Sequence, residues 1–256
     1  MKKFFYCLLS FLFTMQIQCM AQSTSHWTVQ DVVQRGILGI TQKYAEFKIG
    51  SPAITEKTDH FGIQRNIYEV SNCYVTLGIQ KGIVVSVRMF VGKNCDLDVS
   101  DELRKPGTKL SQTTFEDWGR PGEIHFVDPD QFPPCNGCGE YGEFVFGNFD
   151  ARGANGMVEK QLGGGDYSDK VFYVGLQHWK DMIWNSGIDT DHLPLTSDVL
   201  SPCPLQKFDE AGYQLMSKGK ISSIGFGYSG TLQPACSAET DQRIRTTGDF
   251  IKINRK

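Results

Sequence analysis

The sequence predicts an α+β fold in which antiparallel sheets are each packed by one or two helices and disulfides fasten the loops. Residues 73–91 alternate between apolar and polar on both sides of a short glycine loop, which is typical of a β-hairpin. Apolar residues with helical spacing occur near both ends of the chain. Cysteines are spread along the whole chain. We expect either two tandem units or one continuous curved sheet.

Residues 1–21 have the order of a secretory signal. Lys2 and Lys3 precede an apolar run over residues 4–13, and Ala21 supplies a small residue for cleavage. A membrane span needs about 20 apolar residues, and polar residues resume at Thr14. This disfavours an uncleaved anchor, so no stable membrane insertion is expected. We therefore expect an exported protein, periplasmic or secreted, from a bacterium.

Composition sets limits on the partners of this chain. It has 256 residues, of which 40% are hydrophobic and 21% charged, as in ordinary globular proteins. The formal net charge is −3. Because nucleic acids and anionic membranes attract a basic surface, the charge argues against both kinds of partner.

The cysteine pattern predicts a disulfide framework. Cys7 and Cys19 fall in the signal. An even number of cysteines then remains in an oxidising compartment, which favours disulfides but leaves their pairing open. A bridge between the first two would require residues 92–94 to turn back. The candidates are Cys73, Cys95, Cys135, Cys138, Cys203 and Cys236.

Cys135 and Cys138 have the C-x-x-C spacing, for which structural disulfides are the favoured interpretation. A redox dithiol requires a helix after the first cysteine, and none is expected there. Zinc requires four ligands, and His125 is the only nearby histidine. Residues 137–142 match G-x-G-x-x-G, but they lack the preceding strand and following helix that dinucleotide binding needs.

The chain divides at a polar stretch, residues 92–114, that contains Pro106 and Gly107. We expect an N-terminal α+β unit over residues 22–110 and a C-terminal α+β unit over residues 111–256.

In the first unit, residues 29–40 are expected to form a helix because Thr28 and Asp31 have capping-box spacing. A loop should follow over residues 50–62. The hairpin over residues 73–91 is expected to turn through a three-residue loop. That register would place Ile79 opposite Ile83 and Cys73 opposite Met89.

In the second unit we expect a helical turn at residues 115–118, helices at residues 178–184 and 205–216, and a final strand after Gly219. Other strands are expected at residues 123–127, 143–149, 157–162 and 170–176. Residues 82–91 and 219–228 align without a gap. A strand precedes the first segment and a helix the second, which weakens the case for an internal repeat.

No catalytic, cofactor or metal residue is assigned. Residues 227–231 lack the last glycine of a nucleophile elbow, and the histidines share no metal-ligand spacing. Acidic clusters at residues 96–102, 128–130 and 189–191 lack EF-hand spacing.

The leading hypothesis is an exported binding protein without enzymatic activity, such as a periplasmic inhibitor or immunity protein against a hydrolase or toxin. Its partner would be another protein outside the cytoplasm. Tryptophans concentrate binding energy, so Trp118, Trp179 and Trp184 are the candidate interaction surface. The alternatives are a structural envelope protein and a secreted hydrolase with dispersed active-site residues, which would bring His125, His178 or His192 next to a serine or carboxylate.

Overall fold

The computed structural model describes residues 26–59, 62–127, 145–149, 158–164, 169–187, 207–228 and 231. The predicted signal, residues 1–21, lies outside these ranges. So do four of the cysteine candidates: Cys135, Cys138, Cys203 and Cys236.

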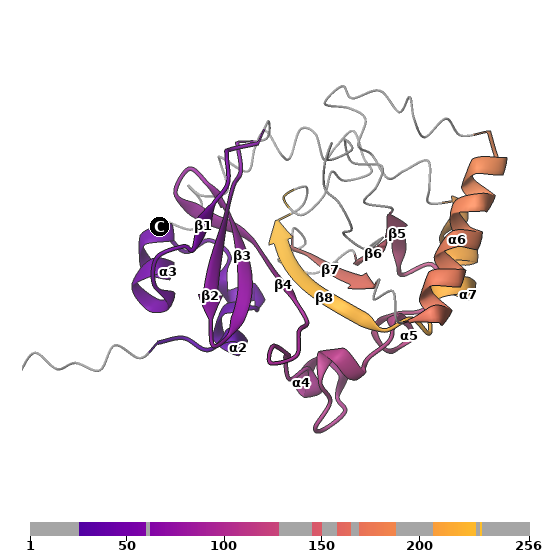
Figure 1. The fold of residues 1–256 in the computed structure, drawn as a ribbon, viewed down its shortest axis with the longest axis horizontal. Coiled ribbons are helices and arrows are strands. Elements are labelled where there is room, and N and C mark those ends of the chain that lie inside the picture. The colour runs from indigo at the N-terminus through magenta and orange to yellow at the C-terminus, as the bar shows by residue number, and fades with distance from the viewer. Residues whose placement is uncertain are drawn as a thin grey trace, which may run out of the picture.

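The strands form one antiparallel sheet in the order β1-β2-β3-β4-β8-β7-β6-β5. They are β1 (Ile54–Thr55), β2 (Gln64–Val70), β3 (Cys73–Gln80), β4 (Ile83–Phe90), β5 (His125–Val127), β6 (Val145–Phe149), β7 (Val158–Gly164) and β8 (Ile221–Tyr228). The predicted α+β class is confirmed. Of the two arrangements expected, the sheet is the continuous curved one (Figure 1). Strands from both predicted units therefore share a single sheet, joined where β4 pairs with β8.

Strands β2, β3 and β4 form a meander with two-residue turns. Ser71 and Asn72 have φ values of 51° and 65°, and Lys81 and Gly82 have values of 51° and 76°. Positive φ at both central residues matches the twist of a hairpin. The sequence analysis did not predict the turn at Ser71 and Asn72.

The predicted register of the second hairpin is wrong. Ile79 pairs with Val84, and Met89 pairs with Val75 instead of Cys73. The turn has two residues instead of three, and a register shift after Gly78 adds a further offset. Both changes carry Cys73 past Met89, toward the end of β4.

A disulfide joins Cys73 to Cys95, one of the pairings that the sequence left open. The required reversal of the chain is present. Gly92 and Cys95 exchange backbone hydrogen bonds of 2.8 and 3.1 Å. The bridge therefore fixes the segment after β4 to the start of β3.

The predicted helix over residues 29–40 is only partly correct. The capping box is present, with Thr28 and Asp31 bonded to each other's backbone amides, but α2 covers only Val29–Val32. A 3-10 turn, η1 (Arg35–Ile37), follows. The chain turns at Gly39, whose φ is +87°, and α3 (Gln42–Ile49) then begins.

The middle of the chain forms short elements. They are α4 (Ser100–Leu103), η2 (Leu110–Gln112) and α5 (Phe115–Trp118). The helical turn predicted at residues 115–118 is confirmed, and Lys105 bonds to Asp117 in it at 2.5 Å. The strands expected near residues 123–127, 143–149 and 157–162 are present as β5, β6 and β7.

The predicted strand over residues 170–176 is wrong, because the segment begins α6 (Lys170–Asn185). Phe172, Leu176, Trp179 and Ile183 are buried at helical spacing, so one helix face forms the packing surface. Within the segment 205–216, α7 (Asp209–Met216) forms, and β8 follows as predicted.

All these helices pack on the same face of the sheet. In the N-terminal half, Tyr68 of β2 donates to Glu46 of α3 at 3.3 Å. In the C-terminal half, the ring of Phe126 on β5 lies 6.4 Å from that of Trp179 on α6. Figure 1 shows the two groups of helices on the outer, convex side of the curve. The concave face is the other one.

Candidate functional site

The concave face carries a row of polar residues across the middle of the sheet. Strand register pairs Thr76 with Arg88, Arg88 with Gly225 and Gly225 with Gln161. We call these four residues the polar row. The register extends the row to Asn148 on β6 and His125 on β5.

Two members of this row, Arg88 and Gln161, form a hydrogen bond with each other across β8. The guanidinium of Arg88 on β4 donates to Oε1 of Gln161 on β7, although β8 runs between the two strands. Neighbouring strands lie about 4.8 Å apart, so the two side chains must meet above β8. Gly225 stands between them without a side chain, which leaves the space for this contact.

Arg88 is a cation in a partly enclosed position. Burial, and to a smaller extent the neighbouring positive charge of Arg65, lower the pKa of its guanidinium to about 10. The group still carries its positive charge at neutral pH. Arg65 lies on the same face of β2 and is paired with Asp59 at 2.7 Å.

Gln161 is oriented by that contact. It is 1% exposed, and an arginine side chain has donors only, so the amide oxygen must face Arg88. Its Nε2 then points elsewhere and has no hydrogen-bond partner among the residues that the structure describes. A buried donor without a partner costs about 1–3 kcal/mol.

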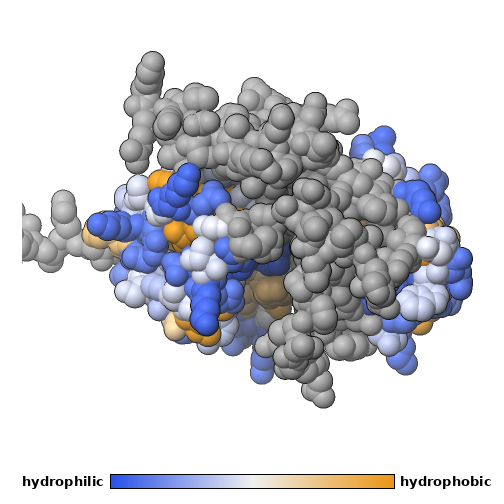
Figure 2. All heavy atoms as spheres, turned by 90° about the horizontal axis from the view of Figure 1, so that it is seen from above, coloured by the Kyte–Doolittle hydropathy of each residue, from blue (hydrophilic) through white to orange (hydrophobic). Residues whose placement is uncertain are grey.

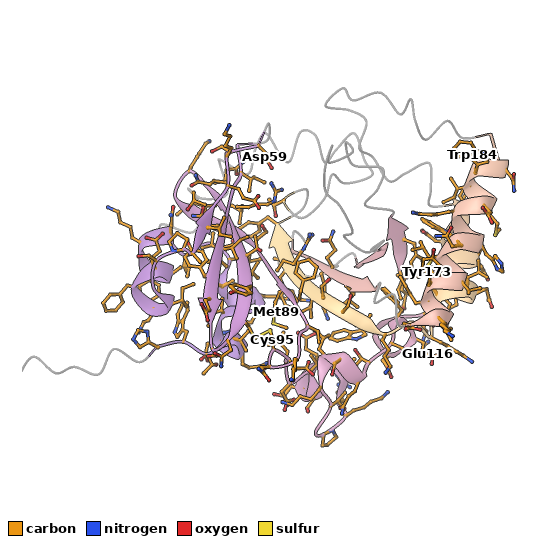
Figure 3. All side chains as sticks on the ribbon, viewed as in Figure 1. Asp59, Met89, Cys95, Glu116, Tyr173 and Trp184 are labelled. Carbon is orange, nitrogen blue, oxygen red and sulfur yellow. A yellow bond between two sulfur atoms is a disulfide. The ribbon has the colours of Figure 1, made fainter. Side chains whose placement is uncertain are left out.

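Beside the polar row, strands β3 and β4 carry two aromatic side chains on the same face of the sheet. Tyr74 on β3 and Phe90 on β4 each lie two residues from a member of the polar row, on the same face. They are 63% and 43% exposed. Met89, labelled in Figure 3, follows Arg88 but lies on the opposite face and is buried.

A second exposed apolar surface lies on α6. Val171, Val174 and Met182 are exposed along one side of the helix, with His178 in the same stripe. Trp184 is 66% exposed at the end of α6, as labelled in Figure 3. At 3.6 residues per turn, Trp184 lies about 120° around the helix from that stripe. We call the stripe and Trp184 together the outer face of α6, although they occupy two sides of the helix. On the side of the molecule seen in Figure 2, the described hydrophobic residues form small patches between hydrophilic ones.

The structure separates the three tryptophans predicted to form one interaction surface. Trp179 is wholly buried, and its Nε1 donates to the carbonyl oxygen of Phe208 at 3.1 Å. Its place on that surface is corrected, because it belongs to the core-facing side of α6. Trp118 is partly buried, with the ammonium of Lys160 4.5 Å from its ring. Trp184 alone of the three is strongly exposed.

The residues considered for catalysis are not brought together among the described residues. His178 lies exposed on α6, and no hydrogen bond joins it to a described serine or carboxylate. The side chain of His125 and the whole of His192 lie outside the description.

The acidic cluster at residues 96–102 is used within the fold. Asp96 accepts from the Ser111 hydroxyl at 2.6 Å, Asp98 accepts from the Ser100 amide at 3.0 Å, and Glu102 pairs with Lys160 at 2.7 Å. In the described ranges no group of three potential metal ligands occurs.

Arg88 and Gln161 were not predicted from the sequence. One signal was present, because Arg88 is the only charged residue in the otherwise apolar run of residues 83–91. Its partner is 73 residues away, and only the pairing of β4 with β8 and of β8 with β7 brings the two together.

Comparisons with known proteins leave the family open. No family model matches the chain, and no curated protein matches it. Three chains of solved structures match. One is a cysteine-rich secretory protein from Staphylococcus aureus, with 12% identity and a TM-score of 0.37 over 81% of this chain and 50% of that chain.

Another is an extracellular protein containing an SCP domain from Bacillus anthracis, with 10% identity and a TM-score of 0.36 over 81% of this chain and 49% of that chain. The chain thus spans about half the length of both structures. Because both TM-scores lie below 0.5, the likeness does not define a shared fold.

Among the helices of the described residues, none has the length and apolar character needed to cross a membrane.

Proposed function

We propose that this chain is exported and acts by binding another protein through the outer face of α6. The proposed export follows from the signal-like residues 1–21 and is consistent with the disulfide between Cys73 and Cys95. The observation that carries the binding function is Trp184, a large aromatic side chain that is 66% exposed at the end of α6.

The outer face of α6 has the composition of a binding surface. Soluble proteins rarely leave several large apolar side chains together in water without a function. An indole buries a large apolar area on binding while losing little conformational freedom, so tryptophan is frequent at the energetic centre of interfaces. The partner should therefore offer an apolar pocket that accepts Trp184.

Attraction of a basic target by the acidic residues of this chain receives less support than apolar contact does. Steering of a basic target requires carboxylates that are available to it. Asp96 and Glu102 are bonded to other residues of the chain, at 2.6 and 2.7 Å. The proposal therefore relies on apolar contact at α6, and the acidic loop at residues 96–102 serves the fold.

Quantitative capture from exported fractions tests the proposal. The oxidised full chain serves as bait beside Trp184→Ala, with Phe47→Ala as the matched control. Phe47 is 60% exposed on α3, in the other half of the sheet, so its removal deletes a similar exposed aromatic. We expect a stoichiometric partner that Trp184→Ala loses at least tenfold and Phe47→Ala retains.

Equal capture by both variants, or loss only with Phe47→Ala, would contradict a site on α6. A co-purifying envelope assembly whose recovery is indifferent to Trp184 would support the structural alternative. The inhibitor hypothesis is finer. It requires that the captured partner is a hydrolase or toxin, and that its activity falls with the wild-type chain but not with Trp184→Ala.

A further inference from the structure

The apolar stripe of α6 has the spacing of a helix-packing surface. Val171, Val174 and Met182 are 58%, 52% and 43% exposed, and His178 lies exposed between the last two. The four residues follow one another at intervals of three and four, as in the seam along which two helices pack. Figure 1 shows α6 at the edge of the described part of the molecule, where a further helix can approach it.

Two exposed residues of opposite charge lie beside this stripe. Lys170 and Asp181 are eleven residues apart, which is close to three whole turns, so both lie on the same flank of the stripe. About 16.5 Å of helix separates them, and they therefore cannot pair with each other within one chain. The stripe thus has a cation at the start of its flank and an anion toward the end.

A second copy of α6 that runs antiparallel matches this pattern. In a twofold contact, residue i of one copy meets residue j of the other, and j meets i. Three pairs of residues have their midpoint within one residue of Leu176. They are Val171 with Met182, Val174 with His178, and Lys170 with Asp181.

One twofold axis at this level satisfies all three pairs. An axis perpendicular to two antiparallel helices keeps the same flank of both copies on the same side of the pair. Lys170 of each copy then lies opposite Asp181 of the other, while the two stripes face each other. A parallel pair would instead place like charges together, which is unfavourable. The charges therefore select the antiparallel arrangement.

We propose that this chain forms a twofold dimer through an antiparallel pair of α6 helices, with the stripe at its centre and ion pairs between Lys170 and Asp181 on one flank. The apolar contact provides the affinity, because exposed ion pairs contribute little and mainly fix the orientation. A helix of 16 residues is about 24 Å long, so this interface is smaller than the standard one of about 1,600 Å² and the dimer should dissociate on dilution. Trp184 lies on another side of α6 and stays available, so the dimer does not depend on the proposed function.

Analytical ultracentrifugation of the oxidised full chain tests the apolar contact, at concentrations from about 1 µM to about 1 mM. Val174→Glu places a carboxylate at the centre of the stripe, and Phe47→Glu is the matched control. Phe47 is 60% exposed on α3, in the other half of the sheet. We expect a dimer that Val174→Glu weakens about tenfold or more, because it buries an unpaired charge, and that Phe47→Glu leaves unchanged. Circular dichroism checks that both variants are folded.

Charge exchange on the flank tests the antiparallel arrangement. Lys170→Glu alone sets two anions opposite each other at both ends of the pair, and Asp181→Lys alone does the same with cations. Each should weaken the dimer about threefold or more at low ionic strength, where charges are least screened. The double variant Lys170→Glu/Asp181→Lys reverses both partners and should restore wild-type association. An equal mixture of the two single variants should associate as well, because both ion pairs form between unlike copies.

Three results would overturn the proposal. One is a monomer at every concentration, and another is a dimer that a folded Val174→Glu variant leaves intact. The third is a double variant that associates as weakly as the single ones. These measurements use the purified chain alone, so their failure would leave the capture of another protein through Trp184 untouched.

Discussion

The two halves of the sheet are held by contacts of different reach along the chain. Strands β2, β3 and β4 follow one another through two-residue turns, and the disulfide between Cys73 and Cys95 closes a separation of 22 residues. The other half depends on an aromatic cluster drawn from distant segments. Phe115 lies 5.6 Å from Phe126 and 6.0 Å from Phe172, and Phe126 lies 6.4 Å from Trp179.

This difference shows how one sheet is assembled from local and distant contacts. The N-terminal meander joins strands that are neighbours in the chain, whereas β8 lies at the centre of the sheet beside β4, with β5, β6, β7, α6 and α7 between them in the chain. Distant contacts require closure of long loops before they contribute stability, so they form late in folding. The pairing of β4 with β8 then couples the two halves.

The largest effect is expected in the aromatic cluster. Trp179→Ala should lower the free energy of unfolding by about 3–5 kcal/mol, because it removes a fully buried ring and its hydrogen bond to Phe208. Trp184→Ala on the same helix is the matched control and should change stability by less than about 0.5 kcal/mol. Urea unfolding followed by circular dichroism measures both. Two separate transitions in Trp179→Ala would break the view that β4 and β8 couple the halves.

In the N-terminal half, the matching experiment is removal of the disulfide between Cys73 and Cys95. Replacing Cys73 and Cys95 together by alanine should cost about 3 kcal/mol, as loop entropy predicts for a separation of 22 residues. Because the bridge constrains only the N-terminal half, hydrogen exchange should accelerate first in β3 and in the segment after β4. A faster first response in β6 and β7 would contradict this assignment. Differential scanning calorimetry gives the size of the effect.

A smaller effect is expected where α6 meets α7. A Cβ at Gly175 would lie 2.3 Å from the carbonyl oxygen of Leu215, so Gly175→Ala must push the two helices apart. We expect a loss of about 1–3 kcal/mol in thermal unfolding. Gly36→Ala is the control from the other half, because a Cβ there has no neighbour closer than 3.9 Å. Equal losses in both variants would remove the distinction between the halves.

The smallest effect is a pH dependence in α5, the short helix between β4 and β5 in the chain. Burial alone would raise the pKa of Asp117, but hydrogen bonds from Lys105 and Thr114 outweigh it and hold the pKa below its usual value of 3.8. A carboxylate with a lowered pKa stabilises the fold above pH 3.8, and this contribution is lost as the pH falls through the lowered value. Asp117→Asn should therefore flatten stability curves between about pH 5 and 2. An unchanged slope would contradict this.

Local signals were sufficient for much of the N-terminal half. The capping box at Thr28 and Asp31 and the alternation in residues 73–91 both act over a few residues, and both predictions hold in the structure. The failures there were also local. A two-residue turn at Lys81 and Gly82 and a register shift at Gly78 displaced the predicted partners of Ile79 and Cys73.

Prediction of the C-terminal half failed where the local pattern was ambiguous. Residues 170–176 contain Val171, Phe172, Val174 and Leu176, a short apolar run that suits a strand or a buried helix equally. Packing decided for the helix, because Phe172 and Trp179 face the same aromatic cluster. The exposed position of Trp184 and the buried position of Trp179 follow from that choice.

By itself the sequence determined the α+β class, the signal-like start, the hairpin and the order of most elements, because hydrophobic period, caps and turns are properties of neighbouring residues. The tertiary structure alone decided that the sheet is continuous, that Cys73 pairs with Cys95, and that Arg88 meets Gln161. These contacts join segments 22 and 73 residues apart. Their geometry depends on strand order and register, which no local pattern encodes.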